Sequence, residues 1–407
     1  MTVPELFNPY QQAFAANPYP TYARLREQNP IFHSAEFGLT FFTRYRDIAN
    51  LLADKRLGRT LSHVMGGEEQ AEKRRQEDWQ ATPAYSRFVR ANLLETEGPD
   101  HARLRRLIAK AINERRIGGL RRHIELLVDE LLDGVAGHKE IDFIADLAVP
   151  LPVHVISEML GWPAEERHRL RPWSADIVRL YEKDHDDKDV SRAEAATAEF
   201  AGMLGELADR RRSDPKDDLI SAFASLESDG DTLSQDELVA SCMMLLNAGH
   251  EAVVNSAGNG LLALLRHPDQ KRGLQRDPAM IKTAIEEMLR YDSPLQFFHR
   301  FALVDMEFGG FKFRKGDTLG LLYGSANRDP AAFEHADTFD IARDPNHHLA
   351  FGLGSHFCLG SPLARLELEI LFSKLLQRFP DIQLLDEQPR YRTGLVFRGL
   401  QQLRVRL

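Results

Sequence analysis

The sequence predicts a mostly α-helical protein with a small β lobe. Apolar residues recur at helical spacing through most of the chain from about residue 100 to about residue 290. By contrast, residues 31–43 resemble a short hairpin, and residues 301–323 alternate apolar and polar residues between glycine-containing turns. Strands near the ends with helices in the middle indicate separate α and β regions. Because no linker-like stretch, repeat or low-complexity tract divides the sequence, we expect one domain over residues 1–407, with further β structure in its C-terminal loop.

The composition limits what the protein can be. Hydrophobic residues make up 43% of the chain, enough for a large core, and the net charge of −9 argues against general nucleic-acid binding. The chain has only two cysteines, which favours a reducing compartment. The segment from Met1 to Tyr10 contains neither a basic region nor an apolar run, so we expect no signal peptide and no membrane anchor. Together these features predict a cytoplasmic protein.

One long apolar helix is predicted near the middle of the chain, from about Ser234 to His267. No proline occurs before Pro268, and Ser234 with Glu237 forms a capping-box pattern at the start. At 1.5 Å per residue such a helix would be roughly 50 Å long. The segment Ala248–Ala252 contains a glycine, which costs on the order of 1 kcal/mol inside a helix. We therefore predict an interruption there that has a use of its own.

Cys358 is the most informative residue of the chain. It lies in the glycine-rich segment Phe351–Gly360, directly before a stretch of helical period from Leu359 to Leu371. Glycines permit positive φ angles and close backbone approach, as a loop against a flat macrocycle requires. A single thiolate at such a turn is one way to offer sulfur to a haem iron. The alternative is a buried structural cysteine, which is the usual state of a free thiol.

The residues around Cys358 resemble the cysteine-ligand signature of the cytochrome P-450 family. The resemblance extends over nearly the whole chain and is greatest to the soluble bacterial branch. It implies the cytochrome P-450 fold, with haem b (iron protoporphyrin IX) held between the long central helix and the helix after the cysteine loop. It also implies that Cys358 is the axial ligand of the iron. The matching positions are Phe351, Gly352, Gly354, His356, Cys358 and Gly360.

Glu287 and Arg290 lie three residues apart in a run of helical period, so they share one helix face. Taken alone, such a pair is a surface ion pair worth well under about 1 kcal/mol. Its place about seventy residues before the cysteine resembles the Glu/Arg pair of the family, which meets a third residue, here Arg343. The resemblance implies a structural role for this pair, in folding and haem retention.

Haem carries two propionates, and their burial requires cations. The resemblance implies candidate cations at three places: His101 with Arg105, then Arg300, and then His356. His101 and Arg105 are four residues apart and therefore lie on one helical face. Each residue could instead be a solvated surface cation, but their joint placement favours propionate binding.

The segment around Gly249 resembles the oxygen-binding segment of the family. Ala248 and Gly249 would open a groove for O2, and Glu251 matches the acid that supplies protons. The family usually has threonine at the next position, whereas this chain has Ala252. A substrate hydroxyl with ordered water could replace the threonine, or Glu251 and water could suffice with help from Ser256. Alternatively, the enzyme does not perform monooxygenation.

Substrate-facing positions follow from the resemblance as well. Four consecutive residues would approach the haem from the side, and the segment Leu395–Phe397 would approach from the C-terminal loop. Their composition predicts an apolar, fairly bulky small molecule as the ligand. The predicted pocket residues are Leu295, Gln296, Phe297, Phe298 and Val396.

Electrons for such a reaction must come from another protein. No G-x-G-x-x-G pattern follows a predicted strand, so we find no nicotinamide- or flavin-binding motif. The resemblance implies a ferredoxin-type donor with an NAD(P)H reductase, docking on the cysteine side of a monomer. A local excess of arginine could receive an acidic ferredoxin, because complementary charges speed encounter. These residues are Arg103, Arg106, Arg115, Arg116, Arg121 and Arg122.

The activity implied by the resemblance is that of a haem-thiolate monooxygenase, which inserts one atom of O2 into a C–H bond. Because of Ala252, a peroxide-driven or nitrogen-oxide-reducing haem-thiolate enzyme is the alternative. A non-enzymatic haem sensor is a third possibility, although no helix-turn-helix pattern supports it.

Overall fold

The computed structural model describes residues 7–76, 80–90, 92–182, 184–228 and 230–407. The chain forms two compact units, each assembled from segments that are far apart in sequence. The prediction of a single domain over residues 1–407 stays a prediction. The first unit consists of Met1–Leu57, Arg121–Pro152 and Glu251–Leu407, and the second of Gly58–Leu120 and Val153–His250.

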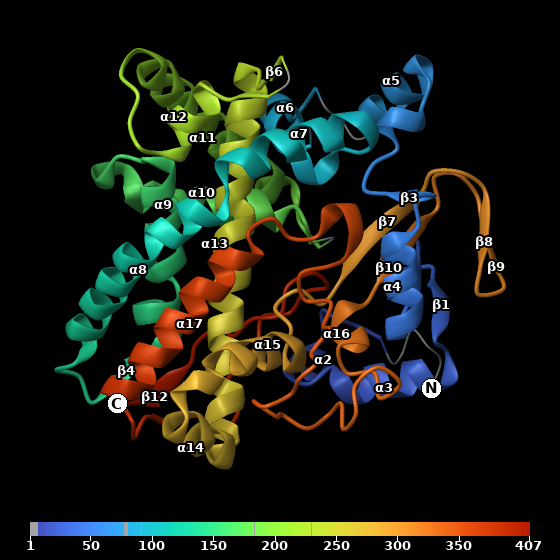
Figure 1. Cartoon of the computed structure of the whole chain (residues 1–407). Coiled ribbons are helices and arrows are strands. Elements are labelled where there is room, and N and C mark those ends of the chain that lie inside the picture. Colours follow the sequence, from blue (N-terminus) through green and yellow to red (C-terminus); the bar gives the residue numbers. More distant parts are fainter. Residues whose placement is uncertain (1–6, 77–79, 91, 183, 229) are drawn as a thin grey trace. The chain divides into compact units, whose positions relative to one another are not determined.

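The predicted β lobe is a five-stranded sheet. In spatial order its strands are β1 (Ile31–Ser34), β2 (Leu39–Phe42), β10 (Thr318–Leu321), β7 (Phe298–Ala302) and β3 (Leu57–Gly58). β1 and β2 form the predicted hairpin, while β10 pairs parallel to β2 and antiparallel to β7. Figure 1 shows a separate hairpin that projects beyond β7 and β10, made of β8 (Met306–Phe308) and β9 (Phe311–Phe313).

Two apolar clusters fill the core beside this sheet. The first combines side chains of β2, β10 and α4 (Tyr45–Ala53), among them Phe42, Leu51 and Leu321. The second surrounds Phe41, whose ring centroid lies 4.9–5.7 Å from the rings of four other phenylalanines. Further helices of the first unit are α2 (Gln12–Ala16), α3 (Tyr19–Gln28), α14 (Pro268–Arg276), α15 (Ile281–Tyr291), α16 (Tyr323–Ala326) and α17 (Ser361–Arg378).

The second unit is built mainly from helices. α10 (Leu170–Arg179) packs along α11 (Asp187–Ser213), where Trp173 stacks on Phe200 with ring centroids 5.3 Å apart. Its other helices are α5 (Gly67–Gln76), α6 (Pro83–Phe88), α7 (Gly98–Ala111) and α12 (Leu219–Ala224). Residues of both units occur in α8 (Glu114–Val135), α9 (Pro150–Leu160) and α13 (Gln235–Arg266).

Short strands inside the helical middle were not predicted. β4 (Glu140–Asp142) pairs with β12 (Arg404–Arg406), which also pairs with β11 (Gln383–Leu384) in the C-terminal region. β5 (Glu227–Ser228) pairs with β6 (Asp231–Thr232). Strands of two or three residues carry too little periodicity to be recognised, and β4 depends on a partner far away in sequence.

The long helix is confirmed as α13, and its capping box forms as predicted. Glu237 N–H donates to Ser234 Oγ at 3.2 Å, and Ser234 N–H donates to Glu237 Oε2 at 2.9 Å. The predicted interruption at Ala248–Ala252 was wrong, because α13 stays helical through these residues. One glycine costs only about 1 kcal/mol, which burial of this long helix outweighs. Among the residues that the structure describes, no helix combines the length and apolar character needed to cross a membrane.

Candidate functional site

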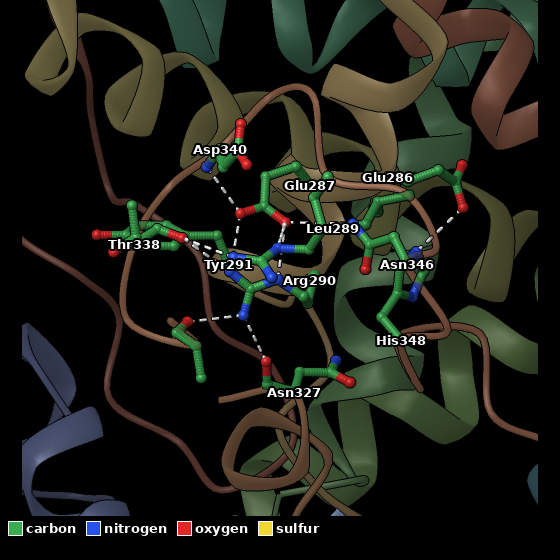
Figure 2. Close-up of polar contacts among 12 residues, drawn as sticks. Glu286, Glu287, Leu289, Arg290, Tyr291, Asn327, Thr338, Asp340, Asn346 and His348 are labelled. Atoms are coloured by element: carbon green, nitrogen blue, oxygen red, sulfur yellow. Dashed lines mark hydrogen bonds and ion pairs between the residues drawn. The ribbon is translucent and has the colours of Figure 1, made fainter. Parts of the chain in front are cut away.

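A buried ion-pair network surrounds Glu287 on α15 (Figure 2). Glu287 and Arg290 are both fully buried, and Arg290 donates from Nε and Nη2 to the two carboxylate oxygens at 2.7 and 2.8 Å. Arg343 Nε adds a third contact, 3.1 Å from Glu287 Oε2. The backbone N–H of Asp340 and the side-chain amide of Asn346 donate to the same carboxylate at 2.9 and 3.2 Å. The structure thus brings the three predicted residues together around one carboxylate.

Arg290 uses its other N–H groups on backbone carbonyls. Nη1 donates to Asn327 O at 2.7 Å and to Ala336 O at 2.8 Å, and Nη2 donates to Thr338 O at 3.1 Å. The guanidinium carbon also lies 5.2 Å from the ring centroid of Phe333. The pair therefore ties α15 to the segment 327–343, an arrangement that suits a structural role.

The cysteine loop is a tight turn in the first unit. Cys358 is half-buried, and its N–H donates to Phe351 O at 3.0 Å. Gly352 and Gly354 have φ angles of 70° and 77°, a region that residues with side chains rarely adopt. A Cβ atom on Gly354 would also lie 2.6 Å from Leu52 O, so no other residue fits there without a shift. Gly352 and Gly354 are therefore required by the turn itself, whereas Gly360 has a φ angle of −83°, which other residues can adopt.

A second network joins α15 and α17 to this loop. Arg365 donates from Nε and Nη2 to Glu286 at 2.6 and 2.8 Å, and His348 Nε2 donates to Glu286 Oε2 at 3.1 Å. His348 Nδ1 accepts from Ala350 N–H at 3.2 Å, which assigns the ring proton to Nε2. Burial would raise the pKa of Glu286, but the hydrogen bonds from Arg365 and His348 outweigh it and hold that pKa at about 2. The Arg365 guanidinium lies 4.4 Å from the Phe351 ring, so this network also braces the loop.

Glu251 has a partner that the sequence did not reveal. Its Oε1 lies 2.5 Å from Nη2 of Arg392, in the loop after β11, and the same nitrogen donates to Asn255 Oδ1 at 2.7 Å. The side chain of Glu251 is 12% exposed and that of Arg392 is 45% exposed. Ser256 Oγ donates to Ala252 O at 2.8 Å. The hydroxyl that could replace the missing threonine is therefore bonded within its own helix.

Ala248 and Gly249 lie in the part of α13 that belongs to the second unit. A Cβ atom on Gly249 would lie 2.9 Å from Cδ1 of Ile156 on α9, so the glycine allows these two helices to approach closely. The next residue, His250, has Nδ1 3.3 Å from Ser174 Oγ on α10. Helix packing thus explains why a glycine occupies position 249, and its predicted role in an oxygen groove stays a prediction.

The predicted propionate ligands belong to both units. His101 is buried and Arg105 half-buried on α7 of the second unit. Arg300 on β7 and His356 in the 3₁₀ turn Gly354–His356 belong to the first unit. Arg300 is 4% exposed and donates from Nη1 to His299 O at 3.0 Å. Propionate binding by these four residues stays a prediction.

Two of the predicted pocket residues, Gln296 and Phe297, are buried in the first unit and are 4% and 5% exposed. Gln296 accepts a hydrogen bond from Tyr22 OH at 3.1 Å and donates to Ser293 O at 2.8 Å. The Phe297 ring packs against Phe41, with centroids 5.7 Å apart. Their assignment to the substrate pocket stays a prediction.

The other predicted pocket residues differ in exposure. Leu295 and Phe298 are half-buried at the edge of the core clusters, and Leu295 forms a β-bridge with Phe397 of the C-terminal loop. Val396, by contrast, is 7% exposed and belongs to the cluster around Phe41, and its assignment to the pocket stays a prediction. Leu295, Phe298 and Phe397 are the partly exposed apolar residues of these two segments.

Most of the arginines predicted to receive a ferredoxin are paired with acidic side chains. These acids come mainly from segments distant in sequence, which is why the sequence did not indicate them. Docking of a ferredoxin at these arginines stays a prediction. The pairs, each within one unit, are Arg103–Glu237, Arg106–Asp231, Arg116–Asp217, Arg121–Glu369 and Arg122–Glu125.

Comparison with known proteins decides the family. The family model described as "Cytochrome P450" matches residues 171–396, more than half of the chain. The chain is also 39% identical to Cytochrome P450 107B1 of Saccharopolyspora erythraea, over 99% of this chain and 98% of that protein. The chain belongs to the cytochrome P450 family. The predicted family and enzyme class, a haem monooxygenase, are thereby confirmed.

Other relatives agree with this assignment. The chain is 37% identical to Vitamin D(3) 25-hydroxylase of Pseudonocardia autotrophica, over 97% of this chain and 95% of that protein. Among solved structures, the cytochrome P450 PksS of Bacillus subtilis superposes with a TM-score of 0.88 at 38% identity, covering 98% of this chain and 99% of that one. The predicted P450 fold, mostly helical with small sheets, is confirmed.

Membership of the P450 family implies a haem-thiolate cofactor, and the cysteine loop fits such a group. Gly360 has no side chain, and a Cβ atom there would lie 4.0 Å from Cys358 Sγ. The first unit also contributes a buried arginine, Arg300, and the loop histidine His356. A single thiol in a glycine-lined turn, with cations for anionic side groups, suits an iron macrocycle.

Sequence reasoning missed three residues of this P450 that support the site. Arg392 gave no signal, because it meets Asn255 at a separation of 137 residues. Arg365 and His348 were detectable in principle. Arg365 lies on the helix that follows Cys358, and His348 lies just before the signature segment.

Proposed function

We propose that this P450 is a haem b monooxygenase in which Cys358 is the axial thiolate. It inserts one atom of O2 into a C–H bond of an apolar, fairly bulky small molecule. The observation that carries the proposal is the turn at Cys358, whose glycines and backbone hydrogen bond set a half-buried sulfur directly before α17. When bound, haem with a thiolate ligand supplies the oxygen chemistry by favouring O–O cleavage.

The residues of the first unit hold and orient this site. The N-terminus of α17 favours negative charge nearby, which suits a thiolate at Cys358. Arg300 and His356 are the proposed partners of the propionates. The Glu287–Arg290 network keeps the segment 327–343 in place from α15, without any part in the chemistry.

Glu251 is the proposed proton donor of the reaction. It is the only one of the residues 251–253 with an acidic side chain, since Ala252 and Val253 are apolar. Ser256 directs its hydroxyl proton to Ala252 O, so this proton is engaged within α13. The hydrogen-bonding group that threonine usually provides is therefore a hydroxyl of the substrate with ordered water.

The proposed substrate and partner follow from apolarity and from the relatives. Leu295, Phe298 and Phe397 offer apolar surface and no charged anchor. One relative is named for hydroxylating vitamin D3, a bulky and largely apolar molecule. We propose a ferredoxin-type donor with an NAD(P)H reductase, a monomeric enzyme and a cytoplasmic location. Because most of the candidate docking arginines of this P450 are paired with acids, recognition of the ferredoxin depends more on shape than on net positive charge.

A peroxide-driven reaction is the second candidate. The observation that favours it is Ala252, together with the internal bond of Ser256, since neither residue offers a free hydroxyl that could pass on a proton. In that case hydrogen peroxide would replace O2 and the reductase. The substrate class would be unchanged.

Oxygen-isotope labelling separates the two candidates. The purified holoenzyme is given ¹⁸O2, NADPH, a surrogate ferredoxin and its reductase, with vitamin D3, a macrolactone and a fatty acid as substrates. Each is tested with and without a hydroxyl near the reacting carbon. The proposal predicts ¹⁸O in the product and efficient use of electrons for the hydroxylated substrates. Product that forms only with added peroxide, without ¹⁸O from O2, would instead establish the peroxide-driven reaction.

A further inference from the structure

We propose that Arg392 is the positioning residue for Glu251 and connects this acid to solvent. The inference deepens the proposed function, because it rests on Glu251 as the proton donor. Arg392 Nη2 lies 2.5 Å from Glu251 Oε1, close enough for a charge-assisted hydrogen bond. Residues 247–256 contain no lysine or arginine that could pair with Glu251. The C-terminal loop therefore supplies the counter-charge.

The loop holds Arg392 firmly enough to position another residue. Arg392 N–H donates to Gly399 O at 2.9 Å, and the adjacent Tyr391 forms a β-bridge with Leu400. Gly399 is essential to this contact, because a Cβ atom there would lie 1.8 Å from Asn255 Oδ1 and 3.0 Å from Arg392 Nη2. The loop backbone can thus lie directly against α13. This approach brings the guanidinium to the carboxylate from a paired, hairpin-like segment.

Asn255 shows that Arg392 orients more than one group. Its side chain is 1% exposed, and its Oδ1 accepts from Arg392 Nη2 at 2.7 Å. This bond fixes which way the amide points. The Nδ2 group is buried and has no hydrogen-bond acceptor among the residues that the structure describes. Arg392 therefore fixes the orientation of a buried N–H donor that lies one helical turn after Glu251.

The two side chains of the pair differ in their exposure to solvent. Glu251 is 12% exposed and Arg392 is 45% exposed, so the pair extends from the buried side of α13 to the surface. The guanidinium of Arg392 fixes the orientation of the Glu251 carboxylate from its exposed side. Water at the exposed edge of Arg392 can resupply the proton that Glu251 donates. Without the guanidinium, the carboxylate would lose both its fixed rotamer and this link.

A double-mutant cycle on the holoenzyme tests the assignment. The variants are Arg392→Gln, Glu251→Gln and their combination, and the measured quantities are the solvent deuterium isotope effect and the share of electrons recovered in product. We expect Arg392→Gln to lower that share severalfold and to increase the isotope effect. In the Glu251→Gln background, Arg392→Gln should have no further effect, because its role is exerted through Glu251. Equal losses in both backgrounds would overturn the assignment.

Arg390→Gln is the matched control, because Arg390 is exposed on the same loop and its substitution removes the same charge. It should behave as the wild type in both measurements. Arg392→Lys should recover part of the lost coupling, because lysine restores the charge without the second hydrogen bond to Asn255. A lysine variant no better than the glutamine variant would overturn a role that depends on charge.

Equilibrium unfolding of the same four proteins gives a readout independent of turnover. Glu251 and Arg392 should couple by about threefold in the unfolding equilibrium constant, as expected of a partly exposed pair. Zero coupling would overturn the contact itself. The haem content and the carbon monoxide spectrum of each variant are recorded in parallel. A wild-type protein without a thiolate spectrum would refute the proposed function, whereas the coupling in unfolding would still test the Arg392–Glu251 contact.

Discussion

Removing the carboxylate of Glu287 is the perturbation whose effect can be worked out most fully. In Glu287→Ala, the guanidinium of Arg290 loses two hydrogen bonds of 2.7 and 2.8 Å and remains in a fully buried position. Arg343, Asp340 N–H and Asn346 lose their acceptor as well. The three backbone carbonyls that also bind Arg290 hold it in place, so it cannot move out to water.

The size of the effect follows from this geometry. Breaking a buried ion pair by removing one partner costs about 3–5 kcal/mol. Each 1.4 kcal/mol is about a tenfold change in an equilibrium constant, so the unfolding constant rises by roughly two to four orders of magnitude. Domains are stable by only about 5–15 kcal/mol in total. We therefore expect a large loss of folded, haem-loaded protein.

Chemical denaturation and haem quantification provide the assay. Glu287→Ala should lower the midpoint of urea unfolding and the haem content together, while any remaining holoenzyme keeps its turnover per haem. Lys282→Ala is the control, because Lys282 is exposed on the same helix and should change stability by no more than about 0.5 kcal/mol. The structural assignment is refuted if Glu287→Ala keeps wild-type stability and haem content but loses turnover.

Two further predictions concern pH. The folded-state pKa of Glu286 is lowered to about 2 from the ordinary value of 4.5, so the stability that its carboxylate contributes is present above pH 4.5 and is lost as the pH falls toward 2. After allowance for solvent screening, Glu286→Gln should remove about 1–2 kcal/mol of this acid-dependent stability, as measured by urea unfolding between pH 2 and pH 4.5. Glu367 is 1% exposed on α17, and burial raises its pKa well above 4.5. The folded state therefore holds this proton more tightly than the unfolded state, and the free energy of unfolding falls as the pH rises above 4.5. Glu367→Gln should flatten that decline and leave stability at pH 7 unchanged or higher, whereas a marked loss at pH 7 would show that the carboxylate is needed.

The sequence predicted those features that local pattern determines. Gly352 and Gly354, shortly before Cys358, are required by positive φ angles, and a capping box at Ser234 is a contact between near neighbours. The Glu287–Arg290 contact is also local, since helical spacing alone places the two residues together. These parts of the site needed no knowledge of the tertiary fold.

Features that depend on distant segments could not be read from the sequence. Arg392 reaches Glu251 only because the C-terminal loop lies against α13, with Gly399 permitting the approach. Gln296 and Phe297 are adjacent residues, and their buried positions depend on contacts with Tyr22 and Phe41, respectively. In each case the deciding partner lies far away along the chain, so no local pattern could indicate it.

The central claim is that Cys358 is the axial thiolate of a bound haem. The most direct test is the absorption spectrum of the reduced protein under carbon monoxide. The wild type should show the absorption band that gives the P450 family its name, and Cys358→His should lose that band even where it retains haem. If Cys358→Ser retained the band, Cys358 could not be the ligand, and the assignment would be contradicted.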